Sequence, residues 1–168
     1  NKILDGIKKQ PGVDRADVAG SLRRHKEIIG DLDLLAGSMW PVSLMDWFTS
    51  MEEVDTIIGK GETKSGIRLK NGMNVDLRVV SPDQYPYALH HFTGSKEHNT
   101  AMRHIARGMN IKMNEYGLFK GKDEVLIPCK DEEAIFNVLG MDYIAPELRE
   151  NHGEIEAAQE GNLPKLVE

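Results

Sequence analysis

Three aspartates placed in apolar segments constrain this chain most. Asp31 and Asp33 alternate with leucine in Gly30-Asp31-Leu32-Asp33, and Asp76 lies in Asn74-Val75-Asp76-Leu77-Arg78. Such runs predict β-strands, in which alternate side chains point to the same face. Asp31 and Asp33 are therefore expected side by side, with Asp76 joining them from a neighbouring strand. Three carboxylates form a hard oxygen ligand set that suits Mg²⁺, and two such ions about 3.5–4 Å apart can hold the oxygens of a phosphoryl transfer.

Composition indicates a soluble globular chain. Its 168 residues are 40% apolar and 29% charged, which is typical of one compact domain with or without a small appendage. No segment approaches the roughly 20 apolar residues of a membrane span, and the polar N-terminus lacks a signal core, so no membrane partner is expected. The chain does not begin with Met and is interpreted as a fragment. Cys129 is its one cysteine, which excludes an internal disulfide and predicts a cytoplasmic location.

The net charge of −6 is unevenly distributed. Residues 1–120 carry 17 Lys and Arg against 15 Asp and Glu, whereas residues 121–168 carry 4 against 12. Cations bound by the three aspartates would neutralise part of the negative charge of the first segment. That segment can therefore face a polyanion, although tight DNA binding by this chain alone is not expected, because Lys and Arg contacts to phosphate dominate such binding.

The pattern along the chain predicts an α+β fold with a strand-rich first half and a smaller α+β lobe after about residue 92. Predicted strands are 13–20, 28–36, 57–58, 66–69, 73–80, 111–118 and 125–127, with a hairpin at Asn71-Gly72. Predicted helices are 2–10, a basic turn at 22–26 capped by Ser21, 41–51, 81–89, 95–109, 131–139 and 153–159. Three histidines, His90, His91 and His98, lack further ligands at structural-zinc spacing and are interpreted as cleft or surface residues.

A second motif precedes the first aspartate pair. In Gly20-Ser21-Leu22-Arg23-Arg24, Gly20 lets the backbone approach a ligand closely. Ser21 and the amides of the following turn can hold phosphate oxygens, and Arg24 can add charge-assisted hydrogen bonds. A Gly-Ser pair alone is commonplace, and so is Asp-x-Asp; their combination with Asp76 is the specific signal.

Together these residues resemble the nucleotidyltransferase superfamily of the DNA polymerase beta type. The segment His91-Phe92-Thr93-Gly94-Ser95, with Asn99 and Arg103 after it, is similar to the Tyr-Phe-Thr-Gly-Ser segment of family X polymerases. Asn114-Glu115-Tyr116 resembles the Asn-Glu-Tyr strand of that family, and Pro146-Glu147-Leu148-Arg149-Glu150 is similar to the end of the polymerase core in bacterial and archaeal members. The resemblance covers roughly residues 1–160.

This resemblance implies a nucleotidyltransferase palm (1–92), with a mixed, largely antiparallel sheet flanked by helices, and a nucleotide-selecting thumb (93–168). It implies a DNA-directed DNA polymerase core that transfers a deoxynucleotide from dNTP to a primer 3′-hydroxyl, releases pyrophosphate and fills gaps in DNA repair. Two Mg²⁺ ions, for which Mn²⁺ can substitute, would be bound by Asp31, Asp33 and Asp76. The implied nucleotide-binding residues are Gly20, Ser21, Arg24, Gly30, His91, Phe92, Gly94 and Asn99. The implied DNA contacts are Arg78, Lys96 and Arg103.

The resemblance has departures. His91 stands where the family usually has Tyr, which leaves rejection of ribonucleotides open, and Asn74 stands where the vertebrate enzyme has an Arg that organises the third aspartate. Helix-hairpin-helix segments, found upstream in the family, do not appear before residue 1; they and a downstream phosphoesterase-type domain are expected in the full-length protein. Two alternatives stay open: a template-independent nucleotidyltransferase acting on another acceptor, and a non-catalytic nucleotide-binding module.

Overall fold

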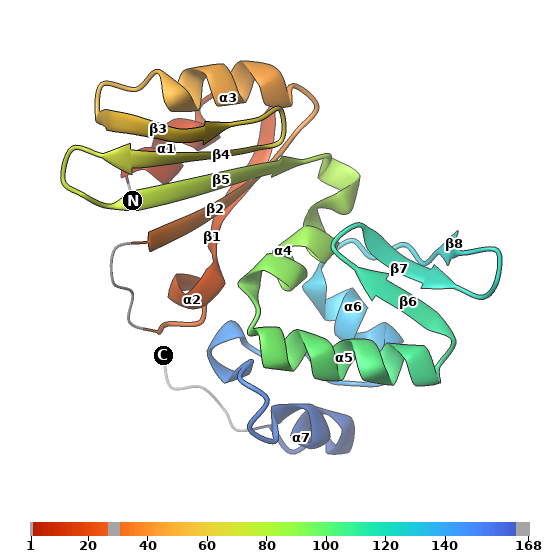
Figure 1. Ribbon diagram of the computed structural model, residues 1–168. Helices are drawn as coiled ribbons and strands as arrows, with labels where there is room; N and C mark the ends of the chain where they lie inside the picture. Colours follow the sequence, from red (N-terminus) through yellow and green to blue (C-terminus); the bar gives the residue numbers. More distant parts are fainter. Residues whose placement is uncertain (1, 27–30, 164–168) are drawn as a thin grey trace. The chain divides into compact units, whose positions relative to one another are not determined.

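The computed structural model describes residues 2–26 and 31–163, and the chain divides into two compact units, Asn1–Tyr85 and Pro86–Glu168 (Figure 1). This division lies earlier than the predicted boundary between residues 92 and 93. The reason is Tyr87, whose ring belongs to the hydrophobic core of the second unit and whose hydroxyl donates to the Ile127 carbonyl at 2.6 Å. No helix in the described ranges is both long enough and apolar enough to cross a bilayer.

The first unit is a five-stranded sheet with the strand order β1-β2-β5-β4-β3. Neighbouring strands are antiparallel except β2 and β5, which are parallel, so the predicted α+β class with a mixed, largely antiparallel sheet is confirmed. Its elements are α1 (Lys2–Lys8), β1 (Val13–Ala19), α2 (Gly20–Arg23), β2 (Asp31–Ser38), α3 (Pro41–Thr49), β3 (Val54–Lys60), β4 (Lys64–Leu69), β5 (Asn74–Val80) and the short 3₁₀ helix η1 (Pro82–Gln84).

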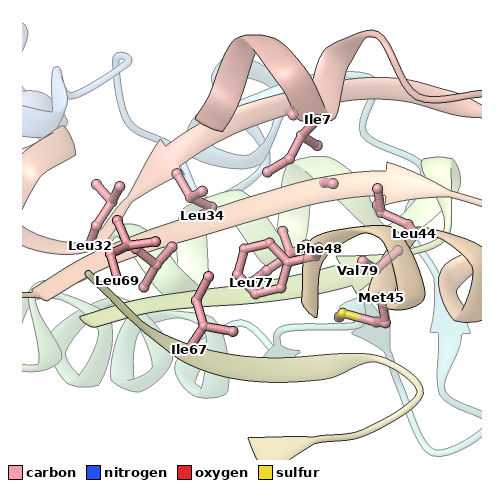
Figure 2. Close-up of a cluster of buried hydrophobic side chains, with 13 residues drawn as sticks. Ile7, Leu32, Leu34, Leu44, Met45, Phe48, Ile67, Leu69, Leu77 and Val79 are labelled. Atoms are coloured by element: carbon pink, nitrogen blue, oxygen red, sulfur yellow. The ribbon is translucent and has the colours of Figure 1, made fainter. Parts of the chain in front are cut away.

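One face of this sheet carries the hydrophobic core, which α1 and α3 cover (Figure 2). Burial alternates along β5: Val75, Leu77 and Val79 are buried, whereas the residues between them are half-buried. Phe48 of α3 and Ile7 of α1 are fully buried against these strands. Each such side chain contributes about 1.5–3 kcal/mol on burial, which fixes which face of every strand turns inward.

Of three local predictions in this unit, one is wrong, one lies partly outside the described residues, and the predicted hairpin is confirmed with a three-residue loop. The cap of α2 is Ala19, without a side-chain hydrogen bond, so Ser21 lies inside the helix instead of capping it. Strand β2 is described from Asp31 onward, and the predicted start at residues 28–30 lies outside the described ranges. The hairpin after β4 closes through Leu69 N–H to Met73 O at 2.8 Å, which makes a three-residue loop with Gly72 in the left-handed region.

The second unit combines helices with an antiparallel sheet of order β6-β7-β8. Its elements are α4 (Tyr85–Thr93), α5 (Lys96–Gly108), β6 (Ile111–Asn114), β7 (Gly117–Lys120), β8 (Val125–Leu126), α6 (Glu132–Val138), η2 (Pro146–Leu148) and α7 (Glu154–Glu160). Its core includes Met102 and Ala106 of α5, Phe136 of α6 and Ile155 of α7. Asp131 caps α6 as predicted, accepting from Ala134 N–H at 2.9 Å.

The predicted strand 111–118 is wrong as a single element, because a tight turn divides it into β6 and β7. Asn114 Oδ1 accepts hydrogen bonds from the backbone N–H groups of Tyr116 (2.8 Å) and Gly117 (3.2 Å). An asparagine that bonds the backbone two and three residues ahead initiates a turn, and this interaction overrides the β propensity of its neighbours.

A buried ion pair ties together three segments of the second unit. The guanidinium of Arg149 is fully buried, donates to Glu132 Oε2 at 2.7 Å, and its Nε donates to the Ile144 carbonyl at 2.9 Å. The ring of Phe136 lies 5.1 Å from the guanidinium carbon. A buried charge with matched acceptors is tolerated, whereas the same charge without its partner is strongly destabilising.

The histidines of α4 and α5 are also placed differently from the prediction. His90 and His98 are buried, so they are not cleft or surface residues. His98 Nδ1 lies 2.7 Å from Glu154 Oε2, and the same carboxylate accepts from the backbone N–H groups of Asn151 and His152. Burial lowers the pKa of His98, and the donated hydrogen bonds hold the pKa of Glu154 below its ordinary value against the effect of burial. The pair is therefore a neutral imidazole donating to a carboxylate.

Replacing Arg149 should destabilise the second unit. The variant Arg149→Met leaves Glu132 buried without its cation, so the free energy of unfolding should fall by about 3–5 kcal/mol, measured by urea denaturation. Adding Glu132→Leu in the same chain should recover part of that loss, because the uncompensated carboxylate is then gone. A double variant no more stable than Arg149→Met would contradict this account.

Acidification should destabilise the second unit in two steps. Because the pKa of His98 is lowered, its stabilising contribution is complete above pH 6.5 and is lost as the pH falls below that value towards the folded pKa. Glu154 contributes above about pH 4.5 and loses its contribution below it. The variant His98→Gln, whose amide can still donate to Glu154, should lose the first step alone in urea titrations between pH 4 and 8.

Candidate active site

The three aspartates lie on the face of the sheet opposite the hydrophobic core. In the parallel pair β2–β5, Asp33 is the direct partner of Asp76 and Asp31 is the partner of Asn74. Direct partners in neighbouring strands point to the same face, about 4.8 Å apart along the sheet. The structure thus brings Asp76 beside Asp33, as the sequence predicts.

The cross-strand register arranges this polar face in three rows. The first row is Asp31, Asn74 and Arg68; the second is Ala19, Asp33, Asp76 and Gly66; the third is Asp17, Leu35, Arg78 and Lys64. In the second row the two acids are flanked by the two smallest side chains of the set. The rows on either side contain the cations Arg68, Arg78 and Lys64.

The electrostatics of Asp33 follow from these rows. Burial raises the pKa of Asp33, and the negative charges of Asp76 and then Asp31 raise it further. Arg78 and Lys64 act in the opposite direction and lower it. A carboxylate held beside two others lacks a matched counter-charge, which is the situation that a bound cation relieves.

Two glycines make room for the carboxylates. A Cβ added to Gly20 would lie 2.5 Å from Asp33 Oδ2, and a Cβ added to Gly66 would lie 2.7 Å from Asp76 Oδ1. Gly20 also has a φ of +65°, which an L side chain rarely adopts. A side chain at either glycine would therefore displace the neighbouring carboxylate.

Asp31 is held differently from the other two. Its Oδ1 accepts from Asn74 Nδ2 at 3.2 Å, and Asn74 Oδ1 in turn accepts from Arg68 Nε at 3.1 Å. Asn74 thus orients Asp31, and Arg68 supplies positive charge from the adjacent strand. In this arrangement no three Asp, Glu, His or Cys side chains of residues 2–26 and 31–163 gather closely enough to grip an ion.

The donor set nevertheless fits Mg²⁺. Three carboxylates on one face supply hard oxygen donors, and the two glycines leave the oxygens of Asp33 and Asp76 unobstructed by side chains at those positions. Mg²⁺ keeps several waters and takes the remaining ligands from one or two carboxylates and from substrate phosphates. The carboxylates therefore need not supply every ligand, because water and substrate phosphates can supply the others.

The remaining predicted residues of the first unit flank the aspartates. Gly20 and Ser21 belong to α2, Arg24 follows it as the C-terminal cap, and Gly30 lies outside the described ranges. Arg78, predicted as a DNA contact, lies on the aspartate face close enough for its charge to lower the pKa of Asp33.

The residues predicted in the second unit form a consecutive stretch from the end of α4 into α5. Asn99 is buried, and its Nδ2 donates to the His91 carbonyl at 2.7 Å, so the amide holds the backbone next to Phe92. The rings of His91 and Phe92 meet edge to face with centroids 4.9 Å apart, and Gly94 has a φ of +72°. Ser95 caps α5 by accepting from His98 N–H at 3.2 Å.

Lys96 and Arg103 lie on α5 itself. Lys96 is exposed in its first turn, and Arg103, half-buried, donates to Thr100 Oγ1 at 3.2 Å. Asn99 and Arg103 are one turn apart and share a face of the helix, as their spacing predicts.

Sequence reasoning missed Gly66, Lys64 and Arg68 on the face that carries the aspartates. It also missed that Asn74 orients Asp31. All four follow from the register of β4 with β5. The signal that could have found them is the hairpin at residues 70–72, since the length of its loop sets which residues face each other.

Comparison with known proteins agrees with this architecture. The family model described as DNA polymerase beta thumb matches residues 88–150. The chain is 34% identical over 140 residues to DNA polymerase/3′-5′ exonuclease PolX of Bacillus subtilis, a match that covers 82% of this chain and 25% of that protein. The chain therefore spans about a quarter of the length of that relative.

Two further relatives match. Over 78 residues the chain is 36% identical to human DNA-directed DNA/RNA polymerase mu. This match covers 46% of this chain and 16% of that protein. Over 136 residues it is 31% identical to Repair DNA polymerase X of an African swine fever virus isolate, which covers 77% of this chain and 78% of the viral protein. The paired aspartate strands and a match of this extent lead to one conclusion: this chain belongs to the family X DNA polymerases.

Proposed function

We propose that this chain is the catalytic core of a DNA-directed DNA polymerase that adds a deoxynucleotide to a primer 3′-hydroxyl and releases pyrophosphate, filling short gaps in DNA repair. The observation that carries the proposal is the direct pairing of Asp33 with Asp76, with Asp31 on the same face. The names of the relatives, which include repair polymerases, support the substrate class.

In this proposal Asp31 and Asp33 hold two Mg²⁺ ions and Asp76 holds only the catalytic one; Mn²⁺ can substitute. When bound, such ions lower the pKa of the attacking hydroxyl and neutralise charge on the phosphates. The chain itself supplies position: Asn74 orients Asp31, and Gly20 and Gly66 keep side chains away from the other two acids. Catalysis then rests on fixed geometry and charge.

Each unit, taken by itself, carries residues that are proposed to contact the nucleotide. Ser21 and Arg24, with the backbone of Gly30, are proposed to bind the β- and γ-phosphates, with Gly20 allowing close approach. Phe92 and Gly94 are proposed to line the sugar and base. His91 stands beside Phe92, its carbonyl fixed by Asn99.

The DNA contacts are proposed separately. Asn99 would reach the minor-groove edge of the incoming base, and Arg103 the templating strand. Such minor-groove contacts test the shape of a base pair more than its identity. Lys96 and Arg78 would contact the DNA backbone. The cytoplasmic location, the upstream helix-hairpin-helix segments and the downstream phosphoesterase-type domain stay predictions for the full-length protein.

Changing Asp76 should abolish incorporation. The variant Asp76→Asn keeps the shape of the side chain but removes a charged metal ligand, so we expect at least about a 1,000-fold loss of rate on a gapped, 5′-phosphorylated duplex with Mg²⁺ and dNTPs. Asp83→Asn, which changes an exposed acid of η1, is the matched control and should retain activity.

The same assay separates the alternatives. Equal uptake of all four nucleotides opposite one template base would indicate a template-independent nucleotidyltransferase. Mg²⁺-dependent dNTP binding without turnover, by the full-length protein as well, would indicate a non-catalytic nucleotide-binding module.

Relieving the charge at Asp33 should stabilise the metal-free chain. Because its pKa is raised in the folded state, the ionised form costs folding free energy at neutral pH. Asp33→Asn should therefore raise the midpoint of urea unfolding in EDTA while abolishing incorporation. A lower midpoint would show that the carboxylate stabilises the fold.

Asn74 should act as a positioning residue for Asp31. In Asn74→Ala the carboxylate loses its hydrogen bond, and the Mg²⁺ concentration for half-maximal incorporation should rise by about 10–100-fold. Binding of Mn²⁺, followed by electron paramagnetic resonance, should weaken in parallel. Thr56→Ala, a change on the exposed strand β3, is the control. An unchanged metal requirement in Asn74→Ala would refute the role.

A further inference from the structure

A segment near the end of the described chain holds the start of α5. Residues 149–154, called the strap below, connect η2 to α7. The carbonyl of Arg149, the first residue of the strap, accepts a hydrogen bond from the N–H of Ser95, the cap of α5, at 2.9 Å. Because the side chain of Arg149 is paired with the buried Glu132, this end of the strap has a fixed place. The strap thus contacts the beginning of the helix that carries Asn99, a proposed nucleotide contact.

The other end of the strap reaches the same turn of the helix through a side chain. Glu154 Oε2 lies 2.7 Å from His98 Nδ1, and the two side chains are 4% and 0% exposed. The same carboxylate accepts from the backbone N–H groups of Asn151 at 3.0 Å and His152 at 2.6 Å. Two donors of the strap therefore fix the carboxylate, and the carboxylate fixes the imidazole.

The first turn of α5 passes this position on to Asn99. Ser95 Oγ accepts from His98 N–H at 3.2 Å, and the Ser95 carbonyl accepts from Asn99 N–H at 2.9 Å. The amide Nδ2 of Asn99 donates to the His91 carbonyl at 2.7 Å. Its Oδ1 is also buried and makes no hydrogen bond within residues 2–26 and 31–163. One end of the amide therefore fixes the backbone at His91, and the other end is an acceptor that a ligand can use.

The chemistry of the buried pair indicates a role beyond stability. A buried polar or ionic pair is often no more stabilising than well-packed apolar side chains of similar volume, so stability alone does not explain Glu154 and His98. The apolar contacts of α5, made by Met102 and Ala106, lie in later turns of the helix and are not directional. Hydrogen bonds to a carboxylate are directional and strong. They can therefore specify where the first turn of α5 lies.

We propose that Glu154 and His98 are positioning residues for nucleotide selection, because the strap that they close sets where the amide of Asn99 meets the incoming base. The inference rests on the proposed function for the identity of the ligand, whereas the coupling between Glu154 and Asn99 does not. Neither Glu154 nor His98 is proposed to touch the nucleotide. Both act through the first turn of α5, and a displacement of about 1 Å at a substrate contact can reduce the rate by about 100-fold.

Removing the hydrogen bond at His98 should weaken nucleotide binding more than turnover. In His98→Leu an apolar side chain that cannot donate to Glu154 replaces the ring. With the full chain and a gapped duplex, the KM for the correct dNTP should rise by about 5- to 10-fold, with kcat changed by less than about 3-fold. Selectivity over an incorrect dNTP should fall by a similar factor, because a mispaired base gains less from Asn99. Misfolding has the opposite signature, since an inactive fraction lowers kcat and leaves KM unchanged.

The conservative variant His98→Asn separates positioning from stability. Its Nδ2 stands where the imidazole Nδ1 was, so it can still donate to Glu154, and KM should stay within about 2-fold of that of the unmodified chain. It also buries an amide oxygen beside Phe136, so it should be less stable than His98→Leu in urea denaturation. The two variants should therefore rank in opposite orders by stability and by nucleotide binding. KM values that follow the order of stability would overturn the proposal.

A change at the other side of the pair should have the same effect. Glu154→Gln replaces a carboxylate, which only accepts hydrogen bonds, by an amide that presents N–H groups to the donors of the strap. It should reproduce the rise of KM seen in His98→Leu. Glu156→Gln, which changes an exposed acid of the same helix, is the matched control and should leave KM unchanged. Equal KM values in Glu154→Gln and Glu156→Gln would overturn the proposal.

A double variant tests whether the effect passes through Asn99. If it does, adding His98→Leu to Asn99→Ala should not raise KM further, because residues that act through one contact are not additive. An additive rise of KM would overturn this route.

Nuclear magnetic resonance of the Asn99 side-chain amide detects the coupling without turnover. Its signals should shift in Glu154→Gln and stay in place in Glu156→Gln; unshifted signals in Glu154→Gln would overturn the coupling. Normal incorporation with an unchanged KM in Glu154→Gln would remove the positioning role and leave the polymerase. No incorporation by the unmodified chain would overturn the proposed function and the role in nucleotide selection with it, whereas shifted amide signals would still support the coupling of the strap to Asn99.

Discussion

The structure depends on the parallel pairing of β2 with β5. This pairing places Asp33 against Asp76, two like charges that repel each other, so the strands must be held together from the other face. Leu34 and Leu77 are direct partners and lie buried there. A slip of one residue would exchange the leucines for the acids, and the core would then contain charged groups. Hydrophobic burial thus enforces a juxtaposition that electrostatics alone would not permit.

The two units treat their charges in opposite ways. In the second unit Arg149 and Glu132 are buried as a matched pair, and Glu154 accepts from His98 and from two backbone amides. These contacts pair the buried acids of the second unit with hydrogen-bond donors. In the first unit the acids stand side by side on an accessible face, with cations only in the flanking rows. The paired charges of the second unit stabilise its fold, whereas the acids of the first unit are the ones proposed to bind metal ions.

Features that depend on neighbouring residues in the sequence could be predicted, whereas features that depend on contacts between distant residues could not. Alternation within β5 indicated that Asp76 faces away from the core, because the pattern is local. The alternation of apolar residues did not predict that residues 111–118 form two strands, because the turn depends on a hydrogen bond to the side chain of Asn114. Burial of His98 depends on Glu154, 56 residues later, and no local pattern contains that information.

Gly20 and Gly66 also limit how this surface can change over evolutionary time. A Cβ at either position would lie within 2.7 Å of a carboxylate oxygen, so a substitution there would displace the neighbouring acid. Variation of the aspartate face is easier at its periphery, at Asn74, Lys64 and Arg68, where a substitution alters charge or hydrogen bonding without a direct clash with an acid. We therefore expect sequence differences among relatives of this chain to be concentrated in strand β4 and at the start of β5.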